Sequence, residues 1–347
     1  MINIYDLTQE ELASECTKLG GKVFNARQIF EWLYKKHVTS FDEMTNISKV
    51  LNQNLKKHFE IIRFKVKKNQ VDPKDKTTKF LFQLNDGNFI ETVLMRFKWG
   101  NSVCVSSEIG CPMACKFCAS GQLKLKRRLT PGEIVLQFLQ VNEYLLKNEK
   151  QCVSNIVVMG IGEPFDNYDN LTKALKIINN PYGIGLGKRS VTVSTCGICE
   201  KILQFAKDQP QANLAISLHA PLDKIREQLM PINKKYNLKK LFNTLDKYVE
   251  LTNSRITFEY IMLDGINDTD ECLKALINLT KNRLCYINLI AYNPVSNTDF
   301  KRSKRINEFR QQLNKNNIIT TLRLERGTNI EAACGQLRAK YETKRKN

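Results

Sequence analysis

The chain has 347 residues, of which 42% are hydrophobic and 26% charged, a composition typical of a globular protein with one large domain and room for a small one. Because it has no run of about 18 apolar residues, we expect no membrane span. Its first residues lack the positive end and apolar stretch of a signal peptide, so we expect a cytoplasmic protein. Thiols stay reduced there, and the eleven cysteines are then metal ligands, catalytic groups or core residues rather than disulfides.

The net charge of +19 favours a polyanionic partner, because such an excess raises the local concentration of polyanions. The basic residues are concentrated in segments 63–68 and 124–128 and in the tail from Lys301 to Lys346. A basic surface without a specific partner is the simpler alternative. An anionic membrane is disfavoured, since no basic amphipathic helix with bulky apolar residues stands out. RNA or DNA is therefore the favoured partner.

The first 60 residues predict short helices. The stretch TQEELASECTKLG has apolar residues at helical spacing, with Thr8 and Glu11 as a capping box, and NARQIFEWLYKKH repeats the pattern. Residues 61–98 alternate between apolar and polar positions and predict a hairpin that turns at Asp86-Gly87. We therefore expect a helical N-terminal domain over residues 1–60, followed by a hairpin extension over 61–98.

Beyond residue 98 the pattern changes, and short β-rich runs alternate with stretches that predict helices. The runs are 102–107, 154–160, 189–195, 213–218, 256–262 and 286–292. Six such alternations predict right-handed crossovers and a parallel sheet, either open or closed into a barrel. Residues 99–347 are thus expected to form one α/β core domain.

Chemically distinctive residues follow the carboxyl ends of these runs, where parallel α/β folds build their sites. A three-cysteine loop follows the first run and GIGEP (160–164) follows the second. Ser194 ends the third run, SLH (217–219) ends the fourth, and Asn293-Pro294 follows the sixth. This shared position predicts a single site at one edge of the sheet.

The loop GCPMACKFCAS contains Cys111, Cys115 and Cys118 within eight positions. Its Gly, Pro and Lys residues make a buried apolar role a poor explanation. A structural zinc site would need a fourth Cys or His from elsewhere in the chain, and the odd number of thiols disfavours a disulfide. The favoured interpretation is an iron–sulfur cluster held by three cysteines, with one iron left open to a ligand that is not protein.

The CxxxCxxC spacing after the first strand of a repeated β/α chain resembles the radical SAM superfamily. A longer series of motifs, in this order, resembles the RlmN/Cfr family over nearly the whole chain: ETV (91–93), CVSSEIGCPMACKFCASG (104–121), GIGEPFDN (160–167), STCGI (194–198), AISLHAP (215–221), MPINKKY (230–236) and EAACGQL (331–337). The resemblance implies a partial (β/α)6 radical SAM barrel with a small helical N-terminal domain. Ile161 and Cys196 depart from the family's usual pattern without altering an expected ligand.

The resemblance also implies an activity, namely methylation of C2 of adenosine 2503 in 23S rRNA and of adenosine 37 in certain tRNAs. A 4Fe-4S cluster on Cys111, Cys115 and Cys118 would bind the amino and carboxylate groups of S-adenosylmethionine (SAM). The residues implied as SAM contacts are Gly162, Glu163, Ser194, Ser217, Leu218, His219 and Asn293. The carboxylate of Glu163 would accept a hydrogen bond from the ammonium group of SAM. We expect a monomer that takes electrons from a donor such as flavodoxin or ferredoxin.

Three further residues carry over from the family as catalytic groups. A first SAM would methylate Cys334, and a second would yield a 5′-deoxyadenosyl radical that removes hydrogen from the S-methyl group. The methylene radical would add to C2, and Glu91 would take the ring proton. Cys104 would then attack the Cys334 sulfur, leaving a transient disulfide and the methylated base. Without the resemblance, both cysteines would be interpreted as core residues and Glu91 as a hairpin carboxylate.

Several alternatives stay open on the sequence alone. His219 could be a hydrogen-bonded core histidine, and Glu163 a helix-capping residue. Methylation of C8 of the same adenosine is the first alternative activity, although GIGEP and the ending LERGTNIEAACGQL favour C2. The second is an RNA-binding protein that holds a structural metal and is not an enzyme. In either case KLKRR (124–128) is expected to contact the RNA backbone.

Overall fold

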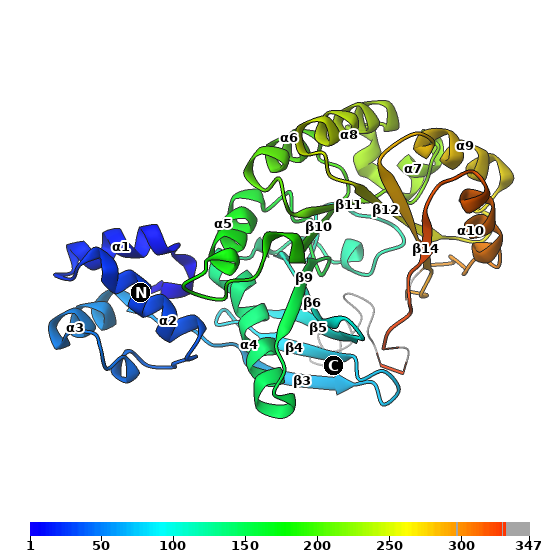
Figure 1. The fold of residues 1–347 in the computed structure, drawn as a ribbon. Coiled ribbons are helices and arrows are strands. Elements are labelled where there is room, and N and C mark those ends of the chain that lie inside the picture. Colours follow the sequence, from blue (N-terminus) through cyan, green and yellow to red (C-terminus); the bar gives the residue numbers. More distant parts are fainter. Residues whose placement is uncertain (296–297, 328, 331–347) are drawn as a thin grey trace.

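A computed structural model describes residues 1–295, 298–327 and 329–330 (Figure 1). In this part of the chain, a ten-stranded sheet is bordered on its outer side by helices, and a small helical unit lies beside it. No helix in the described ranges is long and apolar enough to span a membrane.

The N-terminal unit is helical, as the sequence predicts. It consists of β1 (Ile2–Asn3), α1 (Gln9–Lys18), α2 (Val23–Tyr34), α3 (Lys49–His58) and β2 (Phe59–Glu60). The capping box is confirmed: Thr8 Oγ1 accepts from the Glu11 amide, and Glu11 Oε2 accepts from the Thr8 amide at 2.8 Å. The unit meets the rest of the chain where Asp6 Oδ1 accepts from the Gly132 amide at 2.8 Å.

An antiparallel part of the main sheet follows, made of β3 (Lys65–Val71), β4 (Thr78–Gln83) and β5 (Phe89–Phe97). The predicted hairpin turn at Asp86-Gly87 is confirmed, with Gly87 at a φ of +82° that favours glycine. The sequence did not resolve β3 as a separate strand. Through the antiparallel pair of β5 with β6 (Gly100–Val105), these strands continue directly into the rest of the sheet.

The six predicted parallel strands are confirmed. They are β6, β9 (Val153–Val158), β10 (Val191–Thr195), β11 (Asn213–Ser217), β12 (Ile256–Met262) and β13 (Cys285–Ala291). A further parallel strand, β14 (Thr320–Leu322), was not predicted. The helices between and after them are α4 (Pro131–Glu149), α5 (Tyr168–Asn179), α6 (Cys199–Asp208), α7 (Asp223–Leu229), α8 (Leu238–Thr252), α9 (Asp270–Thr280) and α10 (Ile306–Lys315).

The sheet is an open, partial barrel. Its strand order is β14-β13-β12-β11-β10-β9-β6-β5-β4-β3, so that β14 and β3 are its two edges. Helices α4, α5, α6, α8 and α9 lie along its outer side (Figure 1). Each parallel strand except the last is followed by a segment that crosses back over the sheet, and this brings the carboxyl ends of the strands together at one edge.

Candidate active site

The loop with the three cysteines is held in a closed shape by its own backbone. It follows β7 (Glu108–Ile109) and leads into β8 (Arg127–Arg128), and these two short strands pair with each other. Within the loop, the Cys111 amide donates to Leu123 O at 3.0 Å. A Cβ at Gly121 would lie 2.5 Å from Cys115 O, so the loop can close this tightly only with glycine there.

The three thiols lie close together and are half-buried. Burial raises the pKa of Cys111, and the neighbouring thiolates of Cys115 and Cys118 raise it further. No group of three or more His, Cys, Asp or Glu side chains in the described ranges lies close enough to hold a single metal ion. In an iron–sulfur cluster each cysteine binds a different iron, so the sulfurs need not converge on one point, and soft thiolates suit this group. The donor set therefore fits a 4Fe-4S cluster.

Helix α7 is joined to the cysteine loop by a backbone hydrogen bond. The Lys116 amide donates to Leu229 O, at the end of α7, at 3.0 Å. Phe117 packs edge-to-face on the ring of His219, with 4.7 Å between the ring centroids. The loop is thus fixed both to α7 and to the residue that follows β11.

Arg226, in the middle of α7, ties neighbouring strand ends together. It is fully buried. Its guanidinium donates to the carbonyl oxygens of Cys196 at 2.8 Å and Leu218 at 3.2 Å, and to Asn233 Oδ1 at 2.9 Å. Asn233 in turn donates to Asp223 Oδ1 at 2.8 Å. A buried cation is costly unless it is compensated. No described carboxylate lies within ion-pair distance of Arg226, but Cys196, Cys115 and the carboxylate of Asp223 are near enough to interact with its charge.

Glu163 connects the GIGEP segment to the end of β10. Its carboxylate accepts three hydrogen bonds from protein groups: from Thr195 Oγ1 at 2.6 Å, from the Cys196 amide at 2.8 Å and from the Phe165 amide at 3.0 Å. The group is buried, and that burial raises its pKa despite these donors. Most of its hydrogen-bonding capacity is therefore used within the protein, which makes it a connector of two loops.

Glu108 packs directly against this segment. A Cβ at Gly162, whose φ is +111°, would lie 2.6 Å from the Glu108 Cβ. Glu108 Oε2 accepts from the Glu163 amide at 2.8 Å, while Oε1 is buried without a hydrogen-bond partner among the described residues. Burial, with the nearby carboxylates of Asp166 and Glu163, raises the pKa of Glu108 to about 8. Glu108 therefore keeps its proton to a higher pH than an exposed glutamate does.

The other expected SAM contacts lie at the same edge of the sheet but differ in exposure. Ser194 and Ser217 are half-buried at the ends of β10 and β11, and neither hydroxyl has a hydrogen-bond partner in the described ranges. Asn293 is exposed just after β13. The side chain of Leu218 lies in the main core, and its amide and carbonyl bind Glu259 and Arg226. Ser194, Ser217 and Asn293 are thus accessible to a ligand, whereas Leu218 is not.

The imidazole ring of His219 is neutral, and its Nδ1 accepts a hydrogen bond from the backbone. The Ile261 amide donates to its Nδ1 at 3.1 Å, which assigns the ring proton to Nε2. Burial, with the charges of Arg226 and Arg323, lowers the pKa of His219 to about 3. Its backbone lies in the left-handed region, with φ +54°, because the chain turns sharply there at the end of β11.

The strand register places two expected catalytic groups on one face of the sheet. Val93 pairs with Cys104 on one side and with Lys79 on the other, so Glu91, two residues before Val93, shares their face. Glu91 Oε2 lies 2.8 Å from Lys79 Nζ, and both side chains are buried. The alternate residues, among them Ile90 and Leu94, pack in the core that includes α4. Glu91 and Cys104 therefore lie on the inner face, away from the helices.

Cys334, the third expected catalytic residue, lies outside the described residues. Glu108 and three further charged groups escaped the sequence analysis. Lys79 directly precedes the three apolar residues 80–82 of β4, and Arg226 lies in a helix that was not predicted. Glu259 interrupts the apolar run ITFEYIM and binds Asn288 Nδ2 at 3.0 Å. A lone charge in an apolar run is the signal that would have revealed Lys79 and Glu259.

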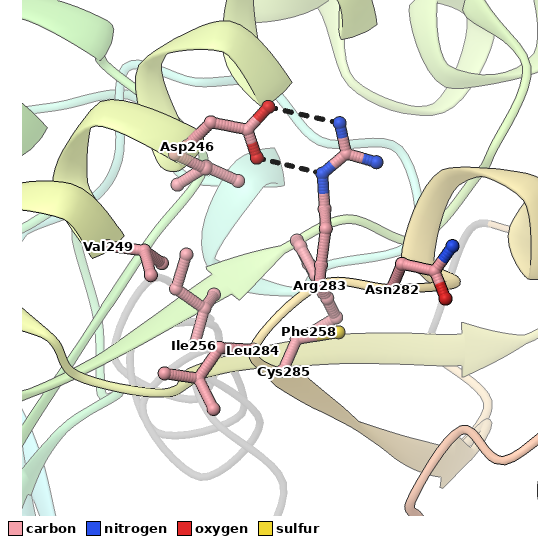
Figure 2. Close-up of a pocket in the computed structure, with 9 residues that line it drawn as sticks. Asp246, Val249, Ile256, Phe258, Asn282, Arg283, Leu284 and Cys285 are labelled. Atoms are coloured by element: carbon pink, nitrogen blue, oxygen red, sulfur yellow. Dashed lines mark hydrogen bonds and ion pairs between the residues drawn. The ribbon is translucent and has the colours of Figure 1, made fainter.

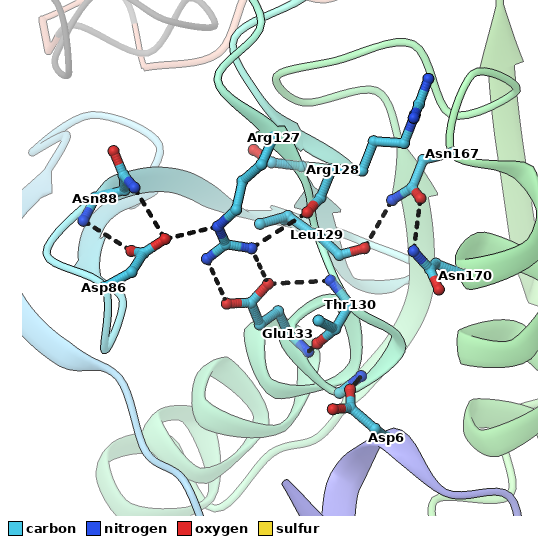
Figure 3. Close-up of polar contacts among 12 residues, drawn as sticks. Asp6, Asp86, Asn88, Arg127, Arg128, Leu129, Thr130, Glu133, Asn167 and Asn170 are labelled. Carbon is cyan, nitrogen blue, oxygen red and sulfur yellow. Dashed lines mark hydrogen bonds and ion pairs between the residues drawn. The ribbon is translucent and has the colours of Figure 1, made fainter. Parts of the chain in front are cut away.

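The basic segment 124–128 is partly committed to the fold (Figure 3). Arg127 forms a two-point ion pair with Glu133 at 2.7 and 2.8 Å, and its Nε contacts Asp86 Oδ2 at 2.6 Å. Nearby, Asn167 Nδ2 donates to Leu129 O at 2.8 Å. Arg127 therefore joins β8 to the start of α4 and to the β4–β5 turn, and it is a weaker candidate for RNA contact than the exposed Lys124 of the same segment.

A cavity of about 150 Å³ lies at the other end of the strands (Figure 2). It is lined by Ile256 and Cys285, which begin β12 and β13, and by the ion pair of Arg283 with Asp246 at 2.9 Å. Because it is at the amino ends of the strands, this cavity is separate from the edge where the cysteine loop lies.

Comparison with known proteins places the chain in a family. Residues 2–61 match the family described as "Ribosomal RNA large subunit methyltransferase N-terminal domain", and residues 107–279 match the radical SAM superfamily. A Malacoplasma penetrans protein named "Probable dual-specificity RNA methyltransferase RlmN" is 52% identical over 98% of this chain and 97% of its own length. The chain belongs to the RlmN family of radical SAM proteins.

Two further similar proteins support this assignment. A Spiroplasma citri protein of the same name is 51% identical over 99% of both chains. The crystal structure of a radical SAM methyltransferase from Sphaerobacter thermophilus matches 97% of this chain with a TM-score of 0.91 and 39% sequence identity. The predicted radical SAM fold is thus confirmed. Membership of the superfamily implies a 4Fe-4S cluster and SAM, which the three-thiol loop fits.

Proposed function

We propose that this chain methylates C2 of an adenosine in 23S rRNA, and of an adenosine in certain tRNAs, through a methyl group carried on Cys334. The observation that carries the proposal is the shared inner face of Glu91 and Cys104, on the same sheet whose strand ends hold the three-cysteine loop. The names of the relatives, which include RNA methyltransferase activity with dual specificity, support the substrate class.

The chemistry requires a carbon radical. C2 of adenine lies between two electronegative ring nitrogens, so it is too electron-poor to attack a methyl sulfonium as a nucleophile. With one electron from a donor such as flavodoxin or ferredoxin, a bound cluster and SAM would supply a 5′-deoxyadenosyl radical. Cys111, Cys115 and Cys118 would hold the cluster, and Ser194, Ser217 and Asn293 would contact SAM. Gly162, Glu163, Leu218 and His219 would shape the SAM site by positioning the backbone around it.

The residues of the inner face would complete the transfer. Cys334 would accept a methyl group from the first SAM and, after losing one hydrogen atom, bond through its methylene carbon to C2. Glu91, whose carboxylate is oriented by Lys79 at 2.8 Å, would take the proton from C2. As the carbon–sulfur bond breaks, the thiolate of Cys104 would bond to the Cys334 sulfur and the methylene carbon would take up a proton to become the methyl group of the base. One electron would pass to an acceptor such as the oxidised cluster, and the two cysteines would be left as a disulfide.

RNA would be bound by the basic surface. The net charge of +19 and the exposed lysines of β3 (Lys65, Lys67 and Lys68) would neutralise phosphates, and the target adenine would leave its stack to reach the inner face. We propose residues 1–60 as an accessory domain for this substrate, with 61–98 as an extension and 99–347 as the catalytic core.

The test is nucleoside mass spectrometry of 23S rRNA and tRNA after reaction with anaerobically purified protein, using C2-methyl and C8-methyl adenosine standards. We expect the C2 product from the wild-type chain and none from Cys334→Ala, which should still bind SAM. A C8 product would overturn the position of methylation. Retained methylation by Cys334→Ala would overturn the role of that cysteine. Colourless protein that contains one zinc ion would overturn the proposal that the chain is an enzyme.

A further inference from the structure

The segment after β14 crosses from one edge of the open barrel to the other. It leaves β14 with the Arg323 amide bound to Leu289 O at 2.8 Å. By Gly327 it has reached the turn between β3 and β4, at the opposite edge of the sheet (Figure 1). Residues 323–327 therefore span the gap that the strands leave open.

Two carboxylates of the β3–β4 turn bind the end of this segment. Asp72 Oδ2 accepts from the Asn329 amide at 2.9 Å, and its Oδ1 accepts from Asn329 Nδ2 at 3.0 Å. Asp75 Oδ2 accepts from the Gly327 amide at 3.1 Å. Arg326 adds a long ion pair to Asp75 at 3.9 Å, and its guanidinium lies over the ring of Phe97 at 4.7 Å from the centroid.

Backbone amides of the β3–β4 turn themselves hold the carboxylates of Asp72 and Asp75 in place. Asp72 Oδ1 also accepts from the Lys74 amide at 2.8 Å, and Asp75 Oδ1 accepts from the Thr77 amide at 2.9 Å. Asp75 therefore uses one oxygen within the turn and presents the other to the segment, whereas both oxygens of Asp72 bind Asn329 and its Oδ1 is shared with the turn. The hydrogen bonds from Asn329 lower the pKa of Asp72, as expected when a carboxylate accepts several donors.

The attachment of Gly327 and Asn329 to the β3–β4 turn lies between two expected parts of the active site. Cys334 follows Asn329 by five residues, so its Cα lies at most about 18 Å from that of Asn329. On the other side, the turn leads into β4, where Lys79 forms the ion pair with Glu91. The same turn thus connects the segment that carries the expected methyl carrier to the strand that orients the expected base.

We propose that Asp72 and Asp75 are positioning residues, which anchor Gly327 and Asn329 to the β3–β4 turn and so fix the point from which the Cys334 segment extends. The proposal rests on the proposed role of Cys334. The simpler alternative is that the two carboxylates only stabilise their own turn. The two differ in their consequences: an anchor affects methyl transfer even when the turn is intact, whereas a turn-stabilising residue does not.

The experiment compares four variants of the full-length, cluster-loaded protein. Asp72→Ala removes the anchor from the turn, and Asn329→Asp opposes two carboxylates while leaving the turn unchanged. The double exchange of Asp72→Asn with Asn329→Asp restores one amide facing one carboxylate. Lys74→Ala is the matched control, since it removes an exposed charge from the same turn and leaves both carboxylates in place.

Three quantities are measured for each variant: hydrogen exchange at the Gly327 and Asn329 amides, the rate of RNA methylation, and SAM affinity with iron content. For Asp72→Ala and Asn329→Asp we expect faster exchange and a loss of about ten- to a hundred-fold in methylation rate, because misplacement by about 1 Å costs this much. SAM affinity and iron content should stay unchanged. The double exchange should recover methylation, and Lys74→Ala should match the wild type.

Unchanged exchange in Asn329→Asp would overturn the anchor, and faster exchange with an unchanged methylation rate would overturn its positioning role. Failure of the proposed function is distinguishable from both outcomes. If wild-type protein carries no methyl group on Cys334, the proposed chemistry fails, while the exchange rates still decide whether the two carboxylates hold the segment.

Discussion

The two halves of the sheet present their chemistry in different ways. In the parallel half, from β6 to β14, the cysteine loop and Glu163 lie on loops just beyond the carboxyl ends of the strands, although Cys104 lies within β6. In the antiparallel half, from β3 to β5, they lie within a strand, as with Glu91 beside Lys79. The loop positions can be predicted from strand order alone, whereas the inner face of the antiparallel half depends on register.

The substitution with the largest expected effect removes one thiol from the cysteine loop of the parallel half. Cys118→Ala should abolish the iron–sulfur absorption of anaerobically purified protein and reduce RNA methylation below detection, because two thiolates cannot hold the cluster that three hold. Cys152→Ala, at an exposed position, is the matched control and should leave both unchanged. A fully loaded, active Cys118→Ala protein would remove the cluster from this loop.

In the antiparallel half, substitutions of Lys79 and Glu91 should affect the free energy of unfolding and RNA methylation differently. Lys79→Met or Glu91→Leu alone removes the ion-pair partner of a buried charge and should cost about 3–5 kcal/mol in the free energy of unfolding. The double variant places two apolar groups together and should recover most of that loss without recovering methylation. Urea unfolding and nucleoside mass spectrometry measure the two effects. A double variant that still methylates RNA would show that the ion pair is structural and that Glu91 is not the base.

The same contrast explains what the sequence could predict. The six parallel strands and the cysteine loop were predictable, because hydrophobic runs and turn residues report them locally. Arg226 was missed because α7, with seven residues, is too short for a helical period to stand out. Lys79 was missed because its partner Glu91 is distant in sequence and only the β4–β5 register brings them together.

Substitution of Arg226 tests whether the strand ends of the parallel half are stabilised by a buried cation. Arg226→Met should lower the free energy of unfolding by about 3 kcal/mol, because the carbonyl oxygens of Cys196 and Leu218 lose their donor in a buried site. Arg226→Lys keeps the charge but has only one nitrogen, so it should recover part of the loss. If the cluster compensates this charge, Arg226→Met should cost more in cluster-loaded protein than in cluster-free protein. Equal losses in both would contradict that compensation.

The smallest effect concerns pH at the junction of the two halves, where Glu108 precedes the cysteine loop. Burial raises the pKa of Glu108 from an ordinary value of 4.5 to about 8, so the folded state binds more protons than the unfolded state between these values. Stability contributed by this group should therefore fall as pH rises from about 5 to 8, and level off above that. Glu108→Gln keeps the acceptor for the Glu163 amide and removes the ionisation. Its melting temperature should match that of the wild type near pH 5 and exceed it by a few degrees near pH 8. A difference that is constant across this range would mean that Glu108 is ionised in the folded protein throughout.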